Sequence, residues 1–243
     1  MLEKNKIYCM DCLEGIKNIA IPDLIIADPP YEFQTNGGGV HAVGHVSKRG
    51  HNLFMQEIED DGINKFDFDK YIPRILDLQK DKVNAYFFCN KVLVPKYLNE
   101  AVKRGLLFDI LTLNKKNPLP CKDSCYLPEI EYIIFLRSKG VFFNGNLNYR
   151  NYFKSFTVII GERNKHPTQK PVELIKRFIK ISSKKNDLIL DMFMGSGTTA
   201  VASKQLNRNF IGFEILEKYI LLAEKRLKQS NFNDWFKQRE DKR

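Results

Sequence analysis

Short apolar runs alternate with amphipathic stretches along this chain of 243 residues. The short runs are rich in β-branched and aromatic side chains, as buried strands are. They occupy residues 5–10, 23–28, 84–90, 108–114, 131–137, 187–193 and 209–215. Helical spacing of apolar residues appears in 95–105, 171–185 and 216–230. In the second of these, Val172, Ile175, Phe178 and Ile179 form one apolar stripe, which predicts a helix with one buried face.

Strand and helix therefore alternate, a pattern typical of a mostly parallel sheet with helices on both faces. We predict an α/β fold with a doubly wound sheet of seven strands, in a single domain over residues 1–243. Sheets of this kind bind ligands at the carboxyl ends of their strands. The two most distinctive loops of the chain follow the runs 23–28 and 187–193, so we expect the site there.

One long segment, 33–68, interrupts the alternation because it is polar and rich in glycine. It is too long for a routine connection, and we expect a mobile loop over the site. Its histidines His41, His45 and His51 could bind a metal, but flanking glycines argue against a rigid ligand geometry. We therefore expect no metal site.

Composition indicates the cellular compartment in which the protein works. No apolar run approaches the length of a membrane span and the first residues lack the apolar core of a signal peptide, so we expect a cytoplasmic protein. The five cysteines are an odd number, which fits a reducing compartment. The pairs Cys9/Cys12 and Cys121/Cys125 could form a zinc site, although the first pair lies where a strand turns into a helix.

Charge favours a polyanionic partner. The net charge is +10, and between Arg137 and Lys170 the only acid is Glu162. Aromatic residues are interleaved with the basic ones there, as in nucleic-acid-binding surfaces, although a solvated basic face with a few core aromatics is the alternative. We predict a DNA-contacting segment at 139–165. Its candidate phosphate ligands are Arg150, Lys154, Arg163 and Lys165.

The stretch "LIIADPPYEF" places an acid directly after a buried strand. Pro29 and Pro30 fix the backbone and remove donors, so the chain leaves the sheet stiffly beside Asp28 and Tyr31. An ordinary proline-rich loop is the alternative to a site.

A second stretch, "LILDMFMGSGTTA", ends a buried strand at Asp191 and Phe193 and opens a helix at Thr198. The glycines of 195–197 allow close backbone approach to a ligand, and the helix start offers free N–H groups. Glu214, at the tip of the next strand, is placed to accept hydrogen bonds from ribose hydroxyls. The GxGxxG spacing of dinucleotide-binding loops is absent.

Taken together, these motifs resemble the DNA amino-methyltransferases of the β arrangement, in which the catalytic motif precedes the cofactor motif. The matching segments are "DPPY" (28–31), "DMFMGSGTT" (191–199), "HPTQKPVELIKRFI" (166–179) and "MDCLEGI" (10–16). The stretch "LTLNKKNP" departs from the family by lacking a tryptophan before its asparagine. The resemblance implies a Rossmann-like methyltransferase fold with circularly permuted motif order, S-adenosylmethionine as methyl donor and double-stranded DNA as substrate.

The family's roles carry over to individual residues. The resemblance assigns catalysis to Asp28, Pro29, Pro30 and Tyr31: the first two accept the amino hydrogens of the target base, and the tyrosine stacks on a base swung out of the duplex. It assigns the donor to Asp11, Asp28, His166, Lys170, Asp191, Phe193, Gly195, Ser196, Gly197, Thr198 and Glu214. Three alternatives stay open: Asp11 as a helix cap, His166 as a cap or core residue, and Lys170 as surface charge.

These roles predict a site-specific methyltransferase acting on adenine N6, because aspartate at the head of the tetrad resembles the adenine enzymes more than the cytosine ones, where serine is usual. The alternatives are a cytosine N4 enzyme, a methyltransferase for free nucleotides or protein amides, and an inactive DNA-binding homologue. A free-nucleotide enzyme would not need the segment 139–165. The sequence leaves open a homodimer and a cognate restriction endonuclease.

Overall fold

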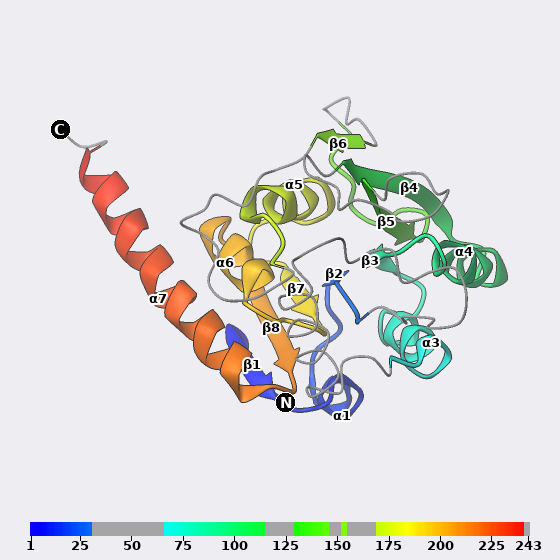
Figure 1. Ribbon diagram of the computed structural model, residues 1–243, viewed down its shortest axis with the longest axis horizontal. Helices are drawn as coiled ribbons and strands as arrows, with labels where there is room; N and C mark the ends of the chain where they lie inside the picture. Colours follow the sequence, from blue (N-terminus) through cyan, green and yellow to red (C-terminus); the bar gives the residue numbers. More distant parts are fainter. Residues whose placement is uncertain (31–65, 115–128, 146–151, 155–168, 241–243) are drawn as a thin grey trace, which may run out of the picture.

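The computed structural model describes residues 1–30, 66–114, 129–145, 152–154 and 169–240. Within them, eight strands form one sheet in the order β1-β8-β7-β2-β3-β5-β4-β6 (Figure 1). The strands are β1 (Lys6–Cys9), β2 (Leu24–Ala27), β3 (Asn84–Cys89), β4 (Leu107–Asn114), β5 (Ile130–Arg137), β6 (Tyr152–Lys154), β7 (Leu188–Asp191) and β8 (Asn209–Glu214).

The sheet is mostly parallel, as predicted. Strands β1, β8, β7, β2 and β3 pair in parallel, whereas β5 runs antiparallel between β3 and β4. All seven predicted strands are present. The eighth, β6, is a short strand that pairs in parallel with β4 at the edge of the sheet, and it comes from within the predicted DNA-contacting segment.

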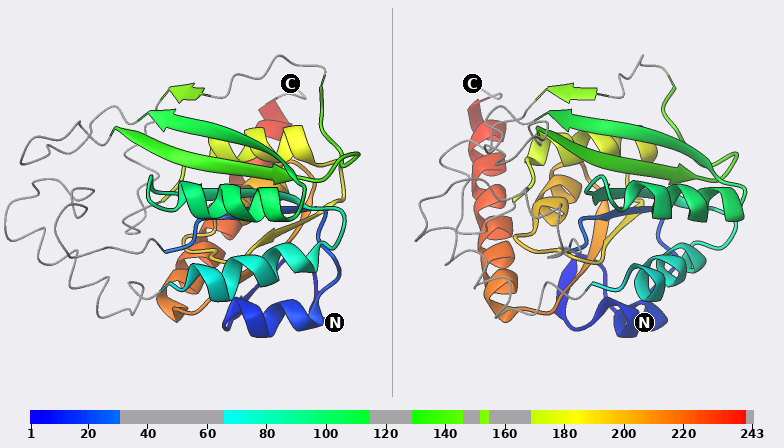
Figure 2. Two further views of the ribbon diagram at one scale, coloured as in Figure 1. Left: turned by 90° about the vertical axis from the view of Figure 1, so that its right-hand side faces the viewer. Right: turned by 45° about the vertical axis from the view of Figure 1, so that its right-hand side comes forward.

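Helices cover both faces of the sheet, so the doubly wound architecture is confirmed. Helices α1 (Cys12–Gly15), α3 (Phe68–Leu78) and α4 (Val94–Lys103) pack on one face, and α5 (Val172–Ser182) and α6 (Thr198–Gln205) on the other (Figures 1 and 2). Successive side chains of β2 point to opposite faces of the sheet. Ile25 and Ala27 pack in the apolar core under α3 and α4, and Leu24 and Ile26 pack in the core under α5. Helix α7 (Glu217–Glu240) lies against α6 and the β1/β8 edge.

Stacked aromatic rings fix α5 to the sheet. The Tyr86 ring stacks on Phe135 at 4.1 Å and on Phe178 of α5 at 4.4 Å between centroids. The Tyr86 hydroxyl lies 2.7 Å from the Ser182 Oγ, so its polar end is satisfied within the core. This packing determines where the chain enters α5, and the residues just before that helix reach the site.

The predicted mobile loop ends earlier than Phe68. Phe66 and Phe68 are buried, with 7% and 2% of their surface exposed, and Asp67 caps α3 by accepting a 3.0 Å hydrogen bond from the Lys70 amide. Two phenylalanines and a cap tie this stretch to the core, because burying each ring contributes on the order of 2 kcal/mol. The rest of the predicted loop, with its three histidines, lies outside the described residues.

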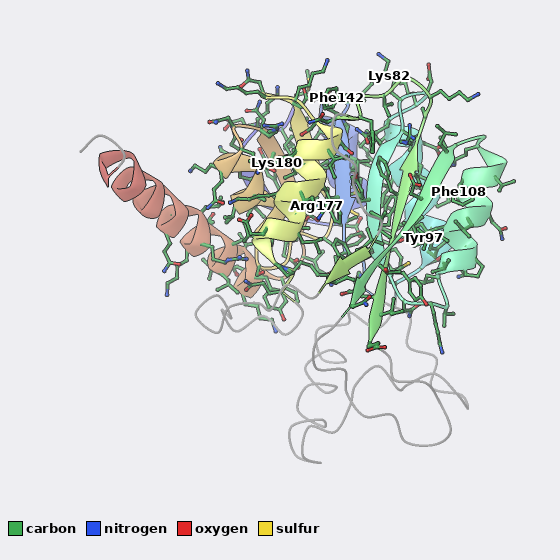
Figure 3. All side chains as sticks on the ribbon, turned by 90° about the horizontal axis from the view of Figure 1, so that it is seen from above. Lys82, Tyr97, Phe108, Phe142, Arg177 and Lys180 are labelled. Atoms are coloured by element: carbon green, nitrogen blue, oxygen red, sulfur yellow. The ribbon has the colours of Figure 1, made fainter. Side chains whose placement is uncertain are left out.

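The described parts of the predicted DNA-contacting segment lie at opposite ends of the strands. Strand β6 pairs with the last residues of β4, Thr112 to Asn114. Residues 139–145 follow the end of β5, beside the start of β3 and away from the strand ends that carry the acids. There the Asn144 amide donates to the Ile181 carbonyl at 2.7 Å. Figure 3 shows Phe142 at the same end of the molecule as Lys82, which precedes β3. Antiparallel β5 carries the chain away from the acids, so residues 139–145 lie at the opposite ends of the strands from them, and the DNA contact of the segment stays a prediction. No helix in the described part is both long and apolar enough to cross a membrane.

Candidate active site

Four carboxylates follow four neighbouring strands at one edge of the sheet. Asp11 comes after β1, Glu214 ends β8, Asp191 ends β7 and Asp28 comes after β2. These strands lie side by side in that order and are parallel, so their carboxyl ends share one edge (Figure 1). The sheet thereby brings together residues that are up to 203 positions apart in the chain, from Asp11 to Glu214.

The glycine loop between β7 and α6 turns tightly at this edge. Gly195 and Gly197 have φ angles of 50° and 79°, in the left-handed region that favours glycine. A Cβ on Gly197 would lie 2.6 Å from the Ala223 Cβ of α7, so only glycine fits there. The Gly195 amide donates to Glu214 Oε2 at 2.8 Å, which ties the loop to the acid of the next strand.

A buried arginine supports the same loop from α7. Arg226 is 6% exposed, and its Nη1 donates to the Ser196 carbonyl, the Ser196 Oγ and the Thr198 Oγ1 at 2.7, 3.0 and 3.1 Å. The Thr198 hydroxyl in turn donates to the Lys170 carbonyl at 3.2 Å. Arg226 is not among the site residues predicted from the sequence. It could have been found from its place three residues after Ala223, next to the apolar stripe of the helix, where a cation is buried only if it has partners.

Asp191 is the most buried of the four acids, with 6% of its surface exposed. The Phe193 amide donates to its Oδ1 at 3.0 Å, and the Thr199 side chain also forms a hydrogen bond with it. Burial raises the pKa of Asp191 to about 7, and the neighbouring carboxylates Asp28 and Glu214 act in the same direction. A positive ligand group would relieve both effects.

Asp11 caps the first turn of α1. Its Oδ1 accepts from the Leu13 amide at 2.7 Å, so the helix-cap alternative is confirmed, while its contact with a donor stays a prediction. Its Oδ2 accepts from the Tyr71 hydroxyl of α3 at 2.5 Å. Phe66 packs edge-on against Phe193 at 5.5 Å and lies 5.4 Å from the Tyr71 ring, which gives an aromatic wall beside Asp11.

Asp28 forms an ion pair that the sequence did not predict. The Lys170 ammonium lies 2.6 Å from Asp28 Oδ2 and 2.9 Å from Glu131 Oε1, and 4.9 Å above the centroid of the Phe88 ring. Burial by itself lowers the pKa of Lys170, but the two carboxylates outweigh it and hold that pKa above its usual value. Lys170 is therefore not plain surface charge.

Most of the predicted site residues in the described part meet at this edge. They are Asp11, Asp28, Pro29, Pro30, Lys170, Asp191, Phe193, Gly195, Ser196, Gly197, Thr198 and Glu214. Tyr31, His166, Arg150, Arg163 and Lys165 lie outside the described residues, as does the side chain of Lys154 in β6. Among the described residues, no group of three or more His, Cys, Asp or Glu side chains could hold a metal ion.

The sequence and the fold both match known proteins. A type II methyltransferase of Lactococcus lactis subsp. cremoris, M2.LlaDCHI, is 33% identical over 240 residues, covering 88% of this chain and 85% of the relative. The solved structure of the M1.HpyAVI–SAM complex is 27% identical, with a TM-score of 0.61 over 91% of this chain and 99% of its own. The cytosine-N4-specific PvuII DNA methyltransferase, at 15% identity and a TM-score of 0.65 over 90% and 84% of the two chains, shares the fold. The family model described as DNA methylase, N6/N4 type, matches residues 22–225, and the chain belongs to that family.

Proposed function

We propose that this chain transfers a methyl group from S-adenosylmethionine to the exocyclic N6 of adenine in DNA. The observation that carries the proposal is the position of Asp28, which follows β2 directly beside β7 and its glycine loop. This arrangement brings an acceptor for amino hydrogens next to a loop suited to a small charged ligand. The match to the DNA methylase family and the SAM complex of M1.HpyAVI support the same reading.

The residues fit the donor in chemistry. S-adenosylmethionine supplies an activated methyl group on a cationic sulfonium, together with an amino group, a carboxylate, a ribose and an adenine. Asp191 is a buried acid that a cation would stabilise. Glu214 already accepts from the Gly195 and Leu216 amides at 2.8 and 3.0 Å, and a carboxylate has about four acceptor sites, so it can also accept from ribose hydroxyls. The turn at Gly197 allows close backbone approach.

Asp28 and Pro29 prepare the target nitrogen for attack. The lone pair of an exocyclic amino group is delocalised into the base, so the nitrogen is a weak nucleophile. Hydrogen bonds from its two hydrogens to the Asp28 carboxylate and the Pro29 carbonyl favour the tetrahedral nitrogen of the transition state. The nitrogen lone pair then forms the new N–C bond, the pair of the broken C–S bond stays on sulfur, and the nitrogen loses one proton to Asp28 or water.

Adenine is favoured over cytosine because the tetrad begins with aspartate, Asp28, as in the adenine enzymes that the motif resembles, whereas serine is usual in the cytosine ones. The cytosine-N4-specific PvuII enzyme shares the fold, and at its level of identity that says nothing about the target base of this chain. A cytosine N4 enzyme is therefore the second candidate. A cognate restriction endonuclease would fit relatives that are type II methyltransferases.

The test is nucleoside mass spectrometry of DNA treated with the protein and the donor. We expect N6-methyladenine from the wild type, and Asp28→Ala should lower turnover by ~10²- to 10³-fold, because it removes an acceptor that matters most in the transition state. Donor affinity, measured by calorimetry, should change far less. Asp81→Asn, at an exposed acid before β3, is the matched control and should behave as the wild type. N4-methylcytosine as the product would replace the adenine proposal with the second candidate.

A further inference from the structure

Glu131 reaches the active-site edge from a strand that runs the other way. Strand β5 is antiparallel to β3, so its first residues lie where the parallel strands end, and Tyr132 pairs with Cys89 at the end of β3. The Glu131 side chain is 11% exposed. A carboxylate is costly to bury without a partner of opposite charge, so its neighbour there is informative.

That neighbour is the ammonium which also contacts Asp28. Lys170 Nζ lies 2.9 Å from Glu131 Oε1 and 2.6 Å from Asp28 Oδ2, and the Phe88 ring provides a third contact at 4.9 Å. The Lys170 side chain is only 13% exposed. An ammonium has three N–H donors, and two carboxylates with one ring face account for them. Each side chain is therefore held by the others.

The charges of this cluster matter for the proposed reaction. Asp28, Glu131 and Lys170 together carry a net charge of −1, whereas Asp28 and Lys170 without Glu131 would be neutral. Positive charge moves onto the target nitrogen as the methyl group is transferred, so a net negative cluster favours the transition state. An ammonium that belonged to Asp28 alone would weaken that carboxylate as an acceptor.

We propose that Glu131 is a positioning residue for the methyl transfer, which holds Lys170 in place and balances its charge so that Asp28 remains a strong hydrogen-bond acceptor. The inference rests on the proposed function. It also gives Lys170 a role other than the one implied by the family resemblance, which assigns this lysine to the donor.

Other titratable groups face the same cluster and must be considered in any pH measurement. Burial, with smaller effects from Glu131 and Asp28, raises the pKa of the Cys89 thiol to about 12. Burial also raises the pKa of Tyr97 in α4, so both groups stay neutral over the working range. Asp191, whose burial raises its pKa to about 7, does titrate there and interacts with Asp28. It is unchanged in all variants, so differences between variants report on the cluster.

The test is the pH dependence of the single-turnover methylation rate at saturating donor and DNA, in four proteins. They are the wild type, Glu131→Gln, Lys170→Met and the double variant, with cluster charges of −1, 0, −2 and −1. The acid limb of the profile reports the protonation of Asp28. In Glu131→Gln it should move to lower pH by about 0.5 to 1 unit, because a negative neighbour is lost. In Lys170→Met it should move to higher pH, because a positive neighbour is lost, and in the double variant it should return close to the wild type. The plateau rate of Glu131→Gln should fall about 10-fold.

Two controls complete the experiment. Glu129→Gln, at an exposed acid two residues before Glu131, should match the wild type. Glu131→Asp keeps the charge, so its acid limb should stay with the wild type even if its rate falls, and it serves if Glu131→Gln does not fold. A Glu131→Gln profile that superimposes on the wild type, a rate loss without movement of the limb, or a moved limb in Glu131→Asp overturns the proposal. If the wild-type product is N4-methylcytosine, the adenine assignment fails. The role of Glu131 is then tested by comparing the acid limbs of the same four proteins for methylation of cytosine.

Discussion

Binding of the donor should release a proton from Asp191 near neutral pH. Burial and two neighbouring carboxylates raise the pKa of this acid to about 7, so at pH 6 roughly nine molecules in ten carry the proton. The cationic groups of the donor favour the carboxylate form. If they lower that pKa by about 2 units, donor affinity should rise about 50-fold between pH 5 and pH 8, equivalent to about 2.3 kcal/mol.

Calorimetry in buffers of different ionisation enthalpy counts the protons. With the same shift, about 0.8 proton should leave at pH 6 and about 0.1 at pH 8. Asp191→Asn removes the titrating group. The donor's own amino group, which titrates near pH 8, contributes equally to both proteins, so subtracting the proton release of Asp191→Asn from that of the wild type leaves the contribution of Asp191. Asp187→Asn is the matched control, since burial also raises the pKa of that acid but it lies before β7, away from the site. A wild-type affinity that is flat from pH 5 to 8 would refute the reasoning.

Three further predictions follow from the glycine loop and the charge of the chain. Arg226→Met removes three hydrogen bonds from the loop, so donor affinity by calorimetry should fall about 10-fold or more, with partial recovery in Arg226→Lys. Gly197→Ala should lower the free energy of unfolding by at least about 2 kcal/mol in denaturant titrations, because φ is 79° and the new Cβ would meet Ala223, and an unchanged midpoint would contradict the turn. If about five phosphates are neutralised, the logarithm of DNA affinity should fall with the logarithm of the salt concentration at a slope near −4 to −5. Alanine at Arg150, Lys154, Arg163 and Lys165 should make this slope shallower, and an unchanged slope would mean that these residues do not contact DNA.

Local sequence was enough to predict much of the fold. A strand such as β2, whose four residues are all buried, needs apolar residues throughout and a stiff exit, and both are written in "LIIADPP". The same holds for the glycine loop, where the left-handed φ angles at Gly195 and Gly197 require the residue type that marks it. The helix stripes of α5 and α7 follow from the period of 3.6 residues.

Contacts between distant elements could not be predicted in this way. Glu131 meets Lys170 because β5 is antiparallel beside β3, and neither strand order nor direction is encoded locally. Tyr71 meets Asp11 because α3 packs beside α1, which depends on the whole core. Strand β6 has three residues, which is too short for a periodic signal, and among the described strands it pairs only with β4. The sequence thus showed Asp11, Asp28, Asp191 and Glu214 but not the contacts that hold them in place.

The order of the strands also has a consequence for how the chain is synthesised. Strand β2 lies between β7 and β3, and β1 pairs with β8, so each of the first two strands made has one neighbour that leaves the ribosome more than 160 residues later, β8 for β1 and β7 for β2. Such long-range pairing makes folding slow and leaves strand edges open meanwhile. The nascent chain therefore carries "DPPY" early but has no strand beside it to supply the glycine loop. We therefore expect methylation competence only after β7, β8 and α7 have been made, and we expect a chain interrupted before β7 to have an exposed edge on β2 and to lack the glycine loop.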